Sequence, residues 1–170
     1  SCSMRCVSSD DVFPNPPNWV GNTIVSAAKE AGVRVVIGQG WAGLGNVKLP
    51  DFVHVVGSTS HATLFPKMAG IIHHGGAGTT AASARSGRPQ VIIPHLLDQF
   101  YWADRVERLH IGPKGFWKSK LTPKRLQRVF QDFLAGDYES NAQTLGEHLQ
   151  KRSGLQEASD YIEQLLSPHR

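Results

Sequence analysis

The chemistry-bearing groups of this chain are densest where an apolar run leads into glycines, in Ile71-Ile72-His73-His74-Gly75-Gly76-Ala77-Gly78-Thr79-Thr80. Glycines let backbone N–H groups approach a phosphate without a Cβ in the way, and the start of a helix presents unpaired N–H donors at the positive end of its dipole. The spacing matches neither the P-loop of triphosphate-binding proteins nor the G-x-G-x-x-G dinucleotide fingerprint. The segment therefore predicts an anion site, with a tight packing corner as the alternative.

The two histidines of this segment, His73 and His74, are expected to differ in role. Neighbouring residues of a strand point to opposite sides, so one histidine should face the core or the backbone while the other can reach a ligand. A metal is not expected, because His73, His74 and His95 have neither a nearby cysteine nor a His-x-x-x-His helix beside them.

Two further polar groups follow predicted strands, and ligands of open parallel sheets bind beyond the carboxyl ends of the strands. Asp98 and Gln99 could bind sugar hydroxyls, whereas Asp98 could equally cap the helix that starts at Gln99, and the two interpretations are compatible. Gly38-Gln39-Gly40-Trp41 closes another strand at the same edge. Trp41 is either a lid on the core or a planar surface beside a base or sugar.

The elements that position these residues alternate between short β-branched runs and helical stretches, which predicts an α/β fold. Strands are expected at residues 4–7, 33–37, 53–56, 70–73 and 90–93, and helices at 17–31, 60–69, 77–87, 99–110, 122–135, 139–152 and 155–166. The predicted architecture is a Rossmann-like parallel sheet with helices on both faces and extra C-terminal helices. A length of 170 residues fits a single domain over residues 1–170.

Composition excludes several classes of protein. Forty per cent hydrophobic and 19% charged residues are ordinary for a globular domain and exclude a disordered tail or a fibre. The two cysteines, Cys2 and Cys6, cannot form disulfides that cross-link the rest of the chain, which fits a reducing compartment. Neither a span of about 20 apolar residues nor a secretory signal is present, so a cytoplasmic location is expected.

The positive charge of the chain is unevenly placed. The net charge is 18 − 14 = +4, yet eight lysines and arginines fall within residues 105–128, opposed there by Glu107 alone. This segment is either a solvated face or an anion-attracting one, which would draw a phosphorylated ligand or an anionic membrane. Phe116 and Trp117 favour an interfacial or interdomain contact over a nucleic-acid platform, and the interfacial alternative would be a peripheral membrane contact through residues 114–120.

Several motifs together resemble the C-terminal half of family 1 glycosyltransferases, and most of all the sterol glucosyltransferases and related bacterial antibiotic and lipid glycosyltransferases. The resemblance is carried by Gly40-Trp41, Ser60-His61-Ala62-Thr63-Leu64-Phe65-Pro66, His73 to Thr80, Gly87-Arg88-Pro89 and Asp98-Gln99-Phe100. It implies one half of a GT-B fold that binds a UDP-sugar, transferred with inversion and without a metal or other cofactor to a sterol or another hydrophobic hydroxyl acceptor.

The resemblance also implies roles for single residues. The diphosphate would lie on His73, Gly75, Gly76, Ala77, Gly78 and Thr79; the sugar on Asp98 and Gln99; and the nucleoside beside Trp41, Ser60 and His61. The chain is expected to hold no catalytic residue, because the general base belongs to an acceptor-binding domain or subunit that this chain lacks.

Two departures from the family pattern bear on the donor. Val7-Ser8-Ser9-Asp10-Asp11 stands where the family has a Gly-Ser loop near the phosphates, and two aspartates there would weaken diphosphate binding. Ala81 stands where plant members carry a ribose-binding glutamate, so UDP and TDP both remain open. A non-catalytic nucleotide-sugar-binding or assembly module is the alternative function, and a UDP-amino-sugar epimerase is less favoured.

Overall fold

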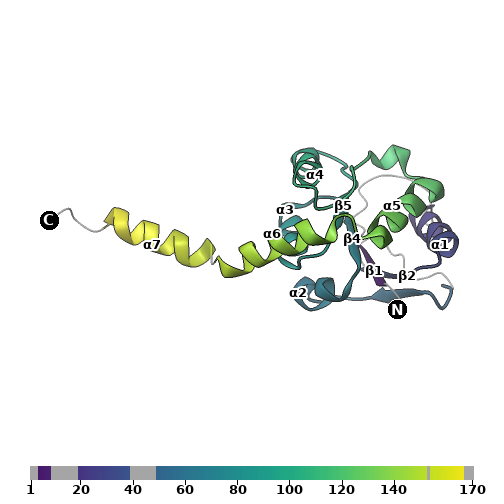
Figure 1. Ribbon diagram of the computed structural model, residues 1–170, viewed down its shortest axis with the longest axis horizontal. Coiled ribbons are helices and arrows are strands. Elements are labelled where there is room, and N and C mark those ends of the chain that lie inside the picture. Colours follow the sequence, from purple (N-terminus) through teal and green to yellow (C-terminus); the bar gives the residue numbers. More distant parts are fainter. Residues whose placement is uncertain (1–3, 9–18, 39–48, 153, 167–170) are drawn as a thin grey trace.

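The computed structural model describes residues 4–8, 19–38, 49–152 and 154–166, and its centre is a five-stranded parallel sheet (Figure 1). The strands are β1 (Met4–Ser8), β2 (Arg34–Gly38), β3 (Val53–Val56), β4 (Gly70–His73) and β5 (Gln90–Ile92), in the order β3-β2-β1-β4-β5. The register pairs Met4 with Arg34 and Ile71 with Gln90. The predicted strands are confirmed, because β-branched runs of this length fit a sheet that is covered on both faces.

The helices are α1 (Trp19–Ala31), α2 (His61–Leu64), α3 (Ala77–Arg85), α4 (Gln99–Arg108), α5 (Pro123–Ala135), α6 (Glu139–Lys151) and α7 (Gly154–Leu166). The expectation of one continuous helix over residues 60–69 is wrong. The chain there forms α2 followed by the 3₁₀ turn η2 (Phe65–Lys67), since Pro66 has no N–H to continue an α-helix. Thr122 caps α5 as expected, its hydroxyl accepting from the backbone N–H of Arg125 at 3.2 Å.

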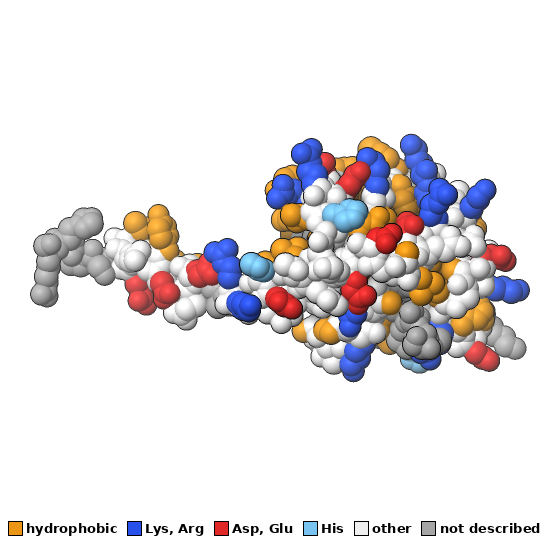
Figure 2. Space-filling view, viewed as in Figure 1, with side chains coloured by type: hydrophobic (Ala, Val, Ile, Leu, Met, Phe, Trp, Pro, Cys, Tyr) orange, Lys and Arg blue, Asp and Glu red, His pale blue; other side chains and the backbone are white. Residues whose placement is uncertain are grey.

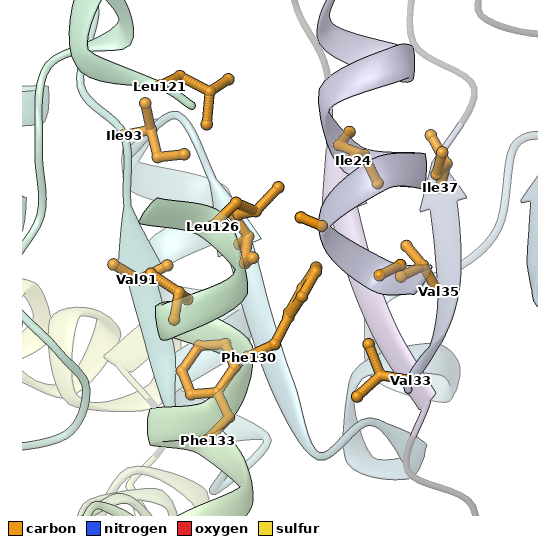
Figure 3. Close-up of a cluster of buried hydrophobic side chains, with 14 of the residues drawn as sticks. Ile24, Val33, Val35, Ile37, Val91, Ile93, Leu121, Leu126, Phe130 and Phe133 are labelled. Atoms are coloured by element: carbon orange, nitrogen blue, oxygen red, sulfur yellow. The ribbon is translucent and has the colours of Figure 1, made fainter. Parts of the chain in front are cut away.

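Helices α1 and α5 lie side by side on one face of the sheet, and the main core fills the space beneath them. Figure 3 shows Leu126 and Phe130 of α5 directed toward α1, where Ile24 closes the core against the strands. Gly70 allows this close approach, because a Cβ there would come within 2.6 Å of three ring atoms of Phe133.

The opposite face is covered by α2, α3, α4 and α6. Neighbouring strand residues divide between the faces: Ile93 belongs to the core under α5, whereas Ile92 packs against Val106 of α4. Helix α6 meets the end of α3 so closely that a Cβ on Gly146 would lie 2.7 Å from the Cα of Gly87. The sequence alternation therefore yields helices on both faces, as predicted.

Helix α7 extends away from the sheet (Figure 1). Arg85 of α3 fixes the end of α6 by donating to the backbone oxygens of Leu149 and Arg152, at 2.5 and 3.0 Å. Arg152 in turn pairs with Glu157 of α7 through two hydrogen bonds. In the part of the chain that the structure describes, no helix has the length and apolarity that crossing a membrane requires.

Candidate functional site

The glycine turn between β4 and α3 has a backbone that only glycine tolerates at one position. Gly75 has a φ of +100°, and a Cβ on it would lie 2.6 Å from Cγ2 of Ile92 and 3.2 Å from Cβ of Gln99. The turn is thus packed directly against the end of β5 and the start of α4. This contact brings two segments together that the sequence assigned to one site, the glycine turn and Gln99.

His73 is buried beneath the glycine turn and is hydrogen-bonded to it. Its side chain is 1% exposed, and its Nδ1 accepts the backbone N–H of Gly75 at 3.1 Å. Nε2 must then carry the ring proton, which it donates to Oε1 of Gln90 at 2.8 Å. Burial, with His74 and His61 nearby, lowers the pKa of His73 to about 4. His73 is therefore a neutral histidine that fixes the path of the turn.

This geometry does not support two of the direct diphosphate contacts expected from the sequence. Both ring nitrogens of His73 are engaged inside the protein, and the N–H of Gly75 is turned inward to His73. The broader expectation, that one of the two histidines faces the core, is confirmed. His74 is the partly exposed one, and its ring lies 6.3 Å from the ring of His95 between centroids.

The start of α3 opens toward solvent at the same edge. Ala77 and Gly78 are exposed and Thr79 is partly exposed. Gly76 occupies the N-cap position without a side-chain cap, whereas the N–H and hydroxyl of Thr80 both bond to the Gly76 oxygen. The first N–H groups of a helix have no acceptor within it, so this end presents donors and a positive dipole end to an anion.

Gln99 and Asp98 lie at the start of α4, beside the turn. Oε1 of Gln99 accepts the backbone N–H groups of His95 and Leu96 at 2.7 and 3.1 Å. Its amide NH₂ group is a donor that could serve a ligand. Asp98 occupies the N-cap position, but its side chain does not cap the helix; Oδ2 accepts from Nε1 of Trp102 at 3.1 Å. The capping interpretation of the Asp98 side chain is therefore wrong, and its carboxylate is exposed.

The expected nucleoside-binding residues are only partly described. Ser60 caps α2 through its backbone oxygen, and the exposed His61 stacks on Phe65 with ring centroids 4.4 Å apart. Helix α2 contacts α3, which places Ser60 and His61 beside the helix that carries the turn. Trp41, Gly40 and the Ser9 to Asp11 segment lie outside the described residues.

Sequence reasoning missed Gln90. It is fully buried, yet it fixes the tautomer of His73 and through it the glycine turn. The available signal was a single amide side chain at the start of an otherwise apolar strand, in a position where a buried polar group needs a partner.

Comparison with known proteins identifies the family. Residues 22–165 match the EryCIII-like C-terminal domain, described as "Erythromycin biosynthesis protein CIII-like, C-terminal domain". The chain belongs to this family. A sterol 3-beta-glucosyltransferase of Arabidopsis thaliana is 34% identical over 140 residues, which are 82% of this chain and 22% of that protein. Vancomycin aglycone glucosyltransferase of Amycolatopsis orientalis is 43% identical over 91 residues, or 52% of this chain and 22% of that enzyme.

Solved structures place this EryCIII-like domain in a GT-B glycosyltransferase fold. The glycosyltransferase VinC, crystallised with dTDP, superposes with a TM-score of 0.77 at 25% identity over 96% of this chain and 41% of VinC. The glycosyltransferase of kitacinnamycin gives a TM-score of 0.80 at 22% identity, covering 98% of this chain and 44% of that one. The resemblance read from the motifs is confirmed, and the chain spans less than half of these structures and about a fifth of the two curated relatives.

Proposed function

We propose that this EryCIII-like domain binds a UDP-sugar, with glucose as the first choice of hexose, for inverting transfer to a sterol or another hydrophobic hydroxyl acceptor. The proposal rests on one observation: the exposed start of α3 follows a glycine turn that packs at Gly75 against Gln99, at the carboxyl edge of the sheet. A sterol 3-beta-glucosyltransferase and a vancomycin aglycone glucosyltransferase among the relatives support the choice of sugar and the hydrophobic acceptor.

We assign the donor's diphosphate to the backbone N–H groups of Ala77, Gly78 and Thr79, and the solvent exposure of this helix start supports the assignment. Negative charge grows on the diphosphate as the bond to the sugar breaks, and preorganised N–H donors at a helix start stabilise that charge. We infer that His74, which is partly exposed beside the turn, adds a further donor. Because these groups supply the electrostatic stabilisation, we expect no metal or other cofactor to be required.

We assign the binding of the sugar hydroxyls to the start of α4. The Gln99 amide NH₂ can donate to a hydroxyl, and the exposed Asp98 carboxylate can accept from one or two. Proton removal from the acceptor is left to an acceptor-binding domain or subunit, because a general base must reach the attacking hydroxyl. Turnover therefore requires that second component.

The basic surface suggests how a membrane-dissolved acceptor could be approached. Figure 2 shows lysine and arginine side chains gathered along the edge of the molecule above α4. Trp117 is 56% exposed, and its ring contacts that of Phe100 in a tilted arrangement with ring centroids 4.4 Å apart. We propose that residues 114–120 make a peripheral membrane contact, with Trp117 at the interface and Lys118 and Lys120 near anionic headgroups.

Calorimetric titration of the full chain with UDP and UDP-glucose tests the donor proposal. We expect saturable binding of both, and an Asp98→Ala substitution should weaken UDP-glucose by about three- to tenfold while leaving UDP unchanged. Asp104→Ala, on the same helix in a surface pair with Arg108, is the matched control and should bind both ligands normally. A chain that binds neither ligand would overturn the proposal.

The non-catalytic alternative makes a different prediction. If the chain is a nucleotide-sugar sensor or assembly module, it binds UDP-glucose but no acceptor-binding partner restores glucose transfer. Titration with dTDP in parallel separates the two nucleotides that the Ala81 departure leaves open.

A further inference from the structure

Leu97, in the turn between β5 and α4, has a backbone conformation that leucine seldom adopts. Its φ is +51°, in the left-handed region, where a bulky residue is an outlier. Among the described residues, the other non-glycine residue with a positive φ is His110. His110 directly follows the C-cap of α4, where a left-handed residue commonly terminates a helix. Leu97 instead precedes a helix, so helix termination does not explain its conformation.

Hydrogen bonds on both sides of Leu97 hold it in this conformation. The backbone N–H of Gln99 donates to the oxygen of Leu96 at 3.3 Å, and Oε1 of Gln99 accepts the backbone N–H groups of His95 and Leu96. Gln99 itself is packed against Gly75 of the glycine turn. A strained residue persists where its surroundings over-determine its backbone, and the turn around Leu97 is such a place.

The strain at Leu97 is not offset by burial of its side chain. Leu97 is 80% exposed, the highest exposed fraction among the large apolar side chains that the structure describes, and the neighbouring Leu96 is 38% exposed. A single surface leucine is ordinary, but one that is both strained and directed to solvent is not. Strained residues gather at ligand-binding and active sites. The combination of strain and exposure therefore indicates a binding role for Leu97.

We propose that Leu97 contacts the apolar body of the acceptor, beside the hydroxyl that receives the sugar. The inference rests on the proposed function, which assigns the sugar to Asp98 and Gln99, the next two residues of the chain. Transfer brings the acceptor oxygen within about 3 to 3.5 Å of the sugar carbon that it attacks, so the carbon skeleton that carries this oxygen lies beside the sugar. Burial of the Leu97 side chain against this skeleton favours a cyclic, sterol-like alcohol over a small polar one.

Two glucosides that resemble transfer products provide the test. Inverting transfer from UDP-glucose, in which the glucose is α-linked, yields β-glucosides. Cyclohexyl β-D-glucopyranoside carries an apolar ring like the hydroxyl-bearing ring of a sterol, whereas methyl β-D-glucopyranoside has the same sugar and almost no apolar body. Each glucoside is titrated into the ¹⁵N-labelled full chain with UDP present at saturation. We expect the cyclohexyl glucoside to bind about fivefold more tightly than the methyl glucoside.

Substitutions at Leu97 test whether this side chain causes the preference. Leu97→Ala and Leu97→Gly should both reduce the preference from about fivefold to near one. Leu97→Gly should also raise the melting temperature by about 2 to 4 °C, because glycine relieves the backbone strain, whereas Leu97→Ala keeps the strain and should not. Leu134→Ala, which shortens a half-exposed leucine of α5, is the matched control and should keep the preference.

The outcomes separate this inference from the donor function. If UDP does not bind, the proposed function fails and the inference fails with it. If UDP binds but the unaltered chain does not prefer the cyclohexyl glucoside, or if both Leu97 variants keep the preference, Leu97 does not contact the acceptor and the donor function stands. A lower melting temperature in Leu97→Gly would show that Leu97 stabilises the chain by internal packing, which would also overturn the inference.

Discussion

Replacing Gly75 with alanine tests whether the glycine turn is held by its packing. The backbone at φ +100° is strained for any residue with a Cβ, at a cost of about 1 to 3 kcal/mol. The new methyl group would also lie 2.6 Å from Cγ2 of Ile92 and 3.3 Å from the Cα of Gln99. Such overpacking costs about 1 to 3 kcal/mol. Reduced freedom of the unfolded chain offsets about 0.5 to 1 kcal/mol.

The expected net loss for Gly75→Ala is therefore about 3 kcal/mol of unfolding free energy. The matched variant is Gly78→Ala, three residues on, where a Cβ would meet no atom within 4 Å. Gly78 lies in α3, and alanine is favoured over glycine inside a helix by about 1 kcal/mol. Gly78→Ala should thus be as stable as the unaltered chain or slightly more so.

Urea unfolding followed by circular dichroism measures both variants against the unaltered chain. We expect opposite changes in stability from two identical chemical changes in one short segment. If Gly75→Ala lost less than about 0.5 kcal/mol, or if Gly78→Ala lost as much as Gly75→Ala, the described turn would be wrong.

Three further predictions concern acid stability, helix packing and the basic surface. The pKa of His73 is lowered from 6.5 to about 4, so the unfolded chain takes up a proton first as the pH falls. About 3 kcal/mol of unfolding free energy that is present above pH 6.5 is therefore lost on approaching pH 4. In urea titrations at several pH values, a His73→Gln variant should lack this pH dependence, whereas the variant of an exposed histidine, His148→Gln, should keep it. Gly146→Ala should lose about 1 to 3 kcal/mol because its methyl group would meet the backbone of Gly87, whereas Gly154→Ala, with open space around it, should not; equal melting temperatures would count against the close packing of α6 on α3. Replacing Lys118 and Lys120 with glutamine should weaken sedimentation with phosphatidylserine vesicles about tenfold or more, and binding that ignores both the substitutions and added salt would contradict a membrane contact.

The sheet and most helices could be predicted from the sequence because their signals are local. Residues 70–73 and 90–92 are apolar enough to be buried strands, and Thr122 and Gly136 mark the ends of α5. The break of the helix at Pro66 could also be predicted, because proline lacks the N–H that continues a helix, although the apolar residues around it favour a continuous helix.

The roles of single polar residues could not be predicted, because they depend on contacts between distant segments. The histidine that enters the core, His73, is hydrogen-bonded there to Gln90, 17 residues away along the chain. Asp98 precedes a helix, as a capping residue would, but Trp102 one turn later captures its carboxylate. In both cases residue type suggested a role and tertiary packing selected another.

The exposed start of α3 is the site that we propose for the diphosphate of a nucleotide sugar. A titration of the ¹⁵N-labelled full chain with UDP, followed by backbone amide shifts, addresses it residue by residue. We expect large, saturable shifts at Ala77, Gly78 and Thr79, and a smaller shift at Gly75, whose N–H is already bonded to His73. Shifts confined to other surfaces, or none at saturating UDP, would contradict this assignment.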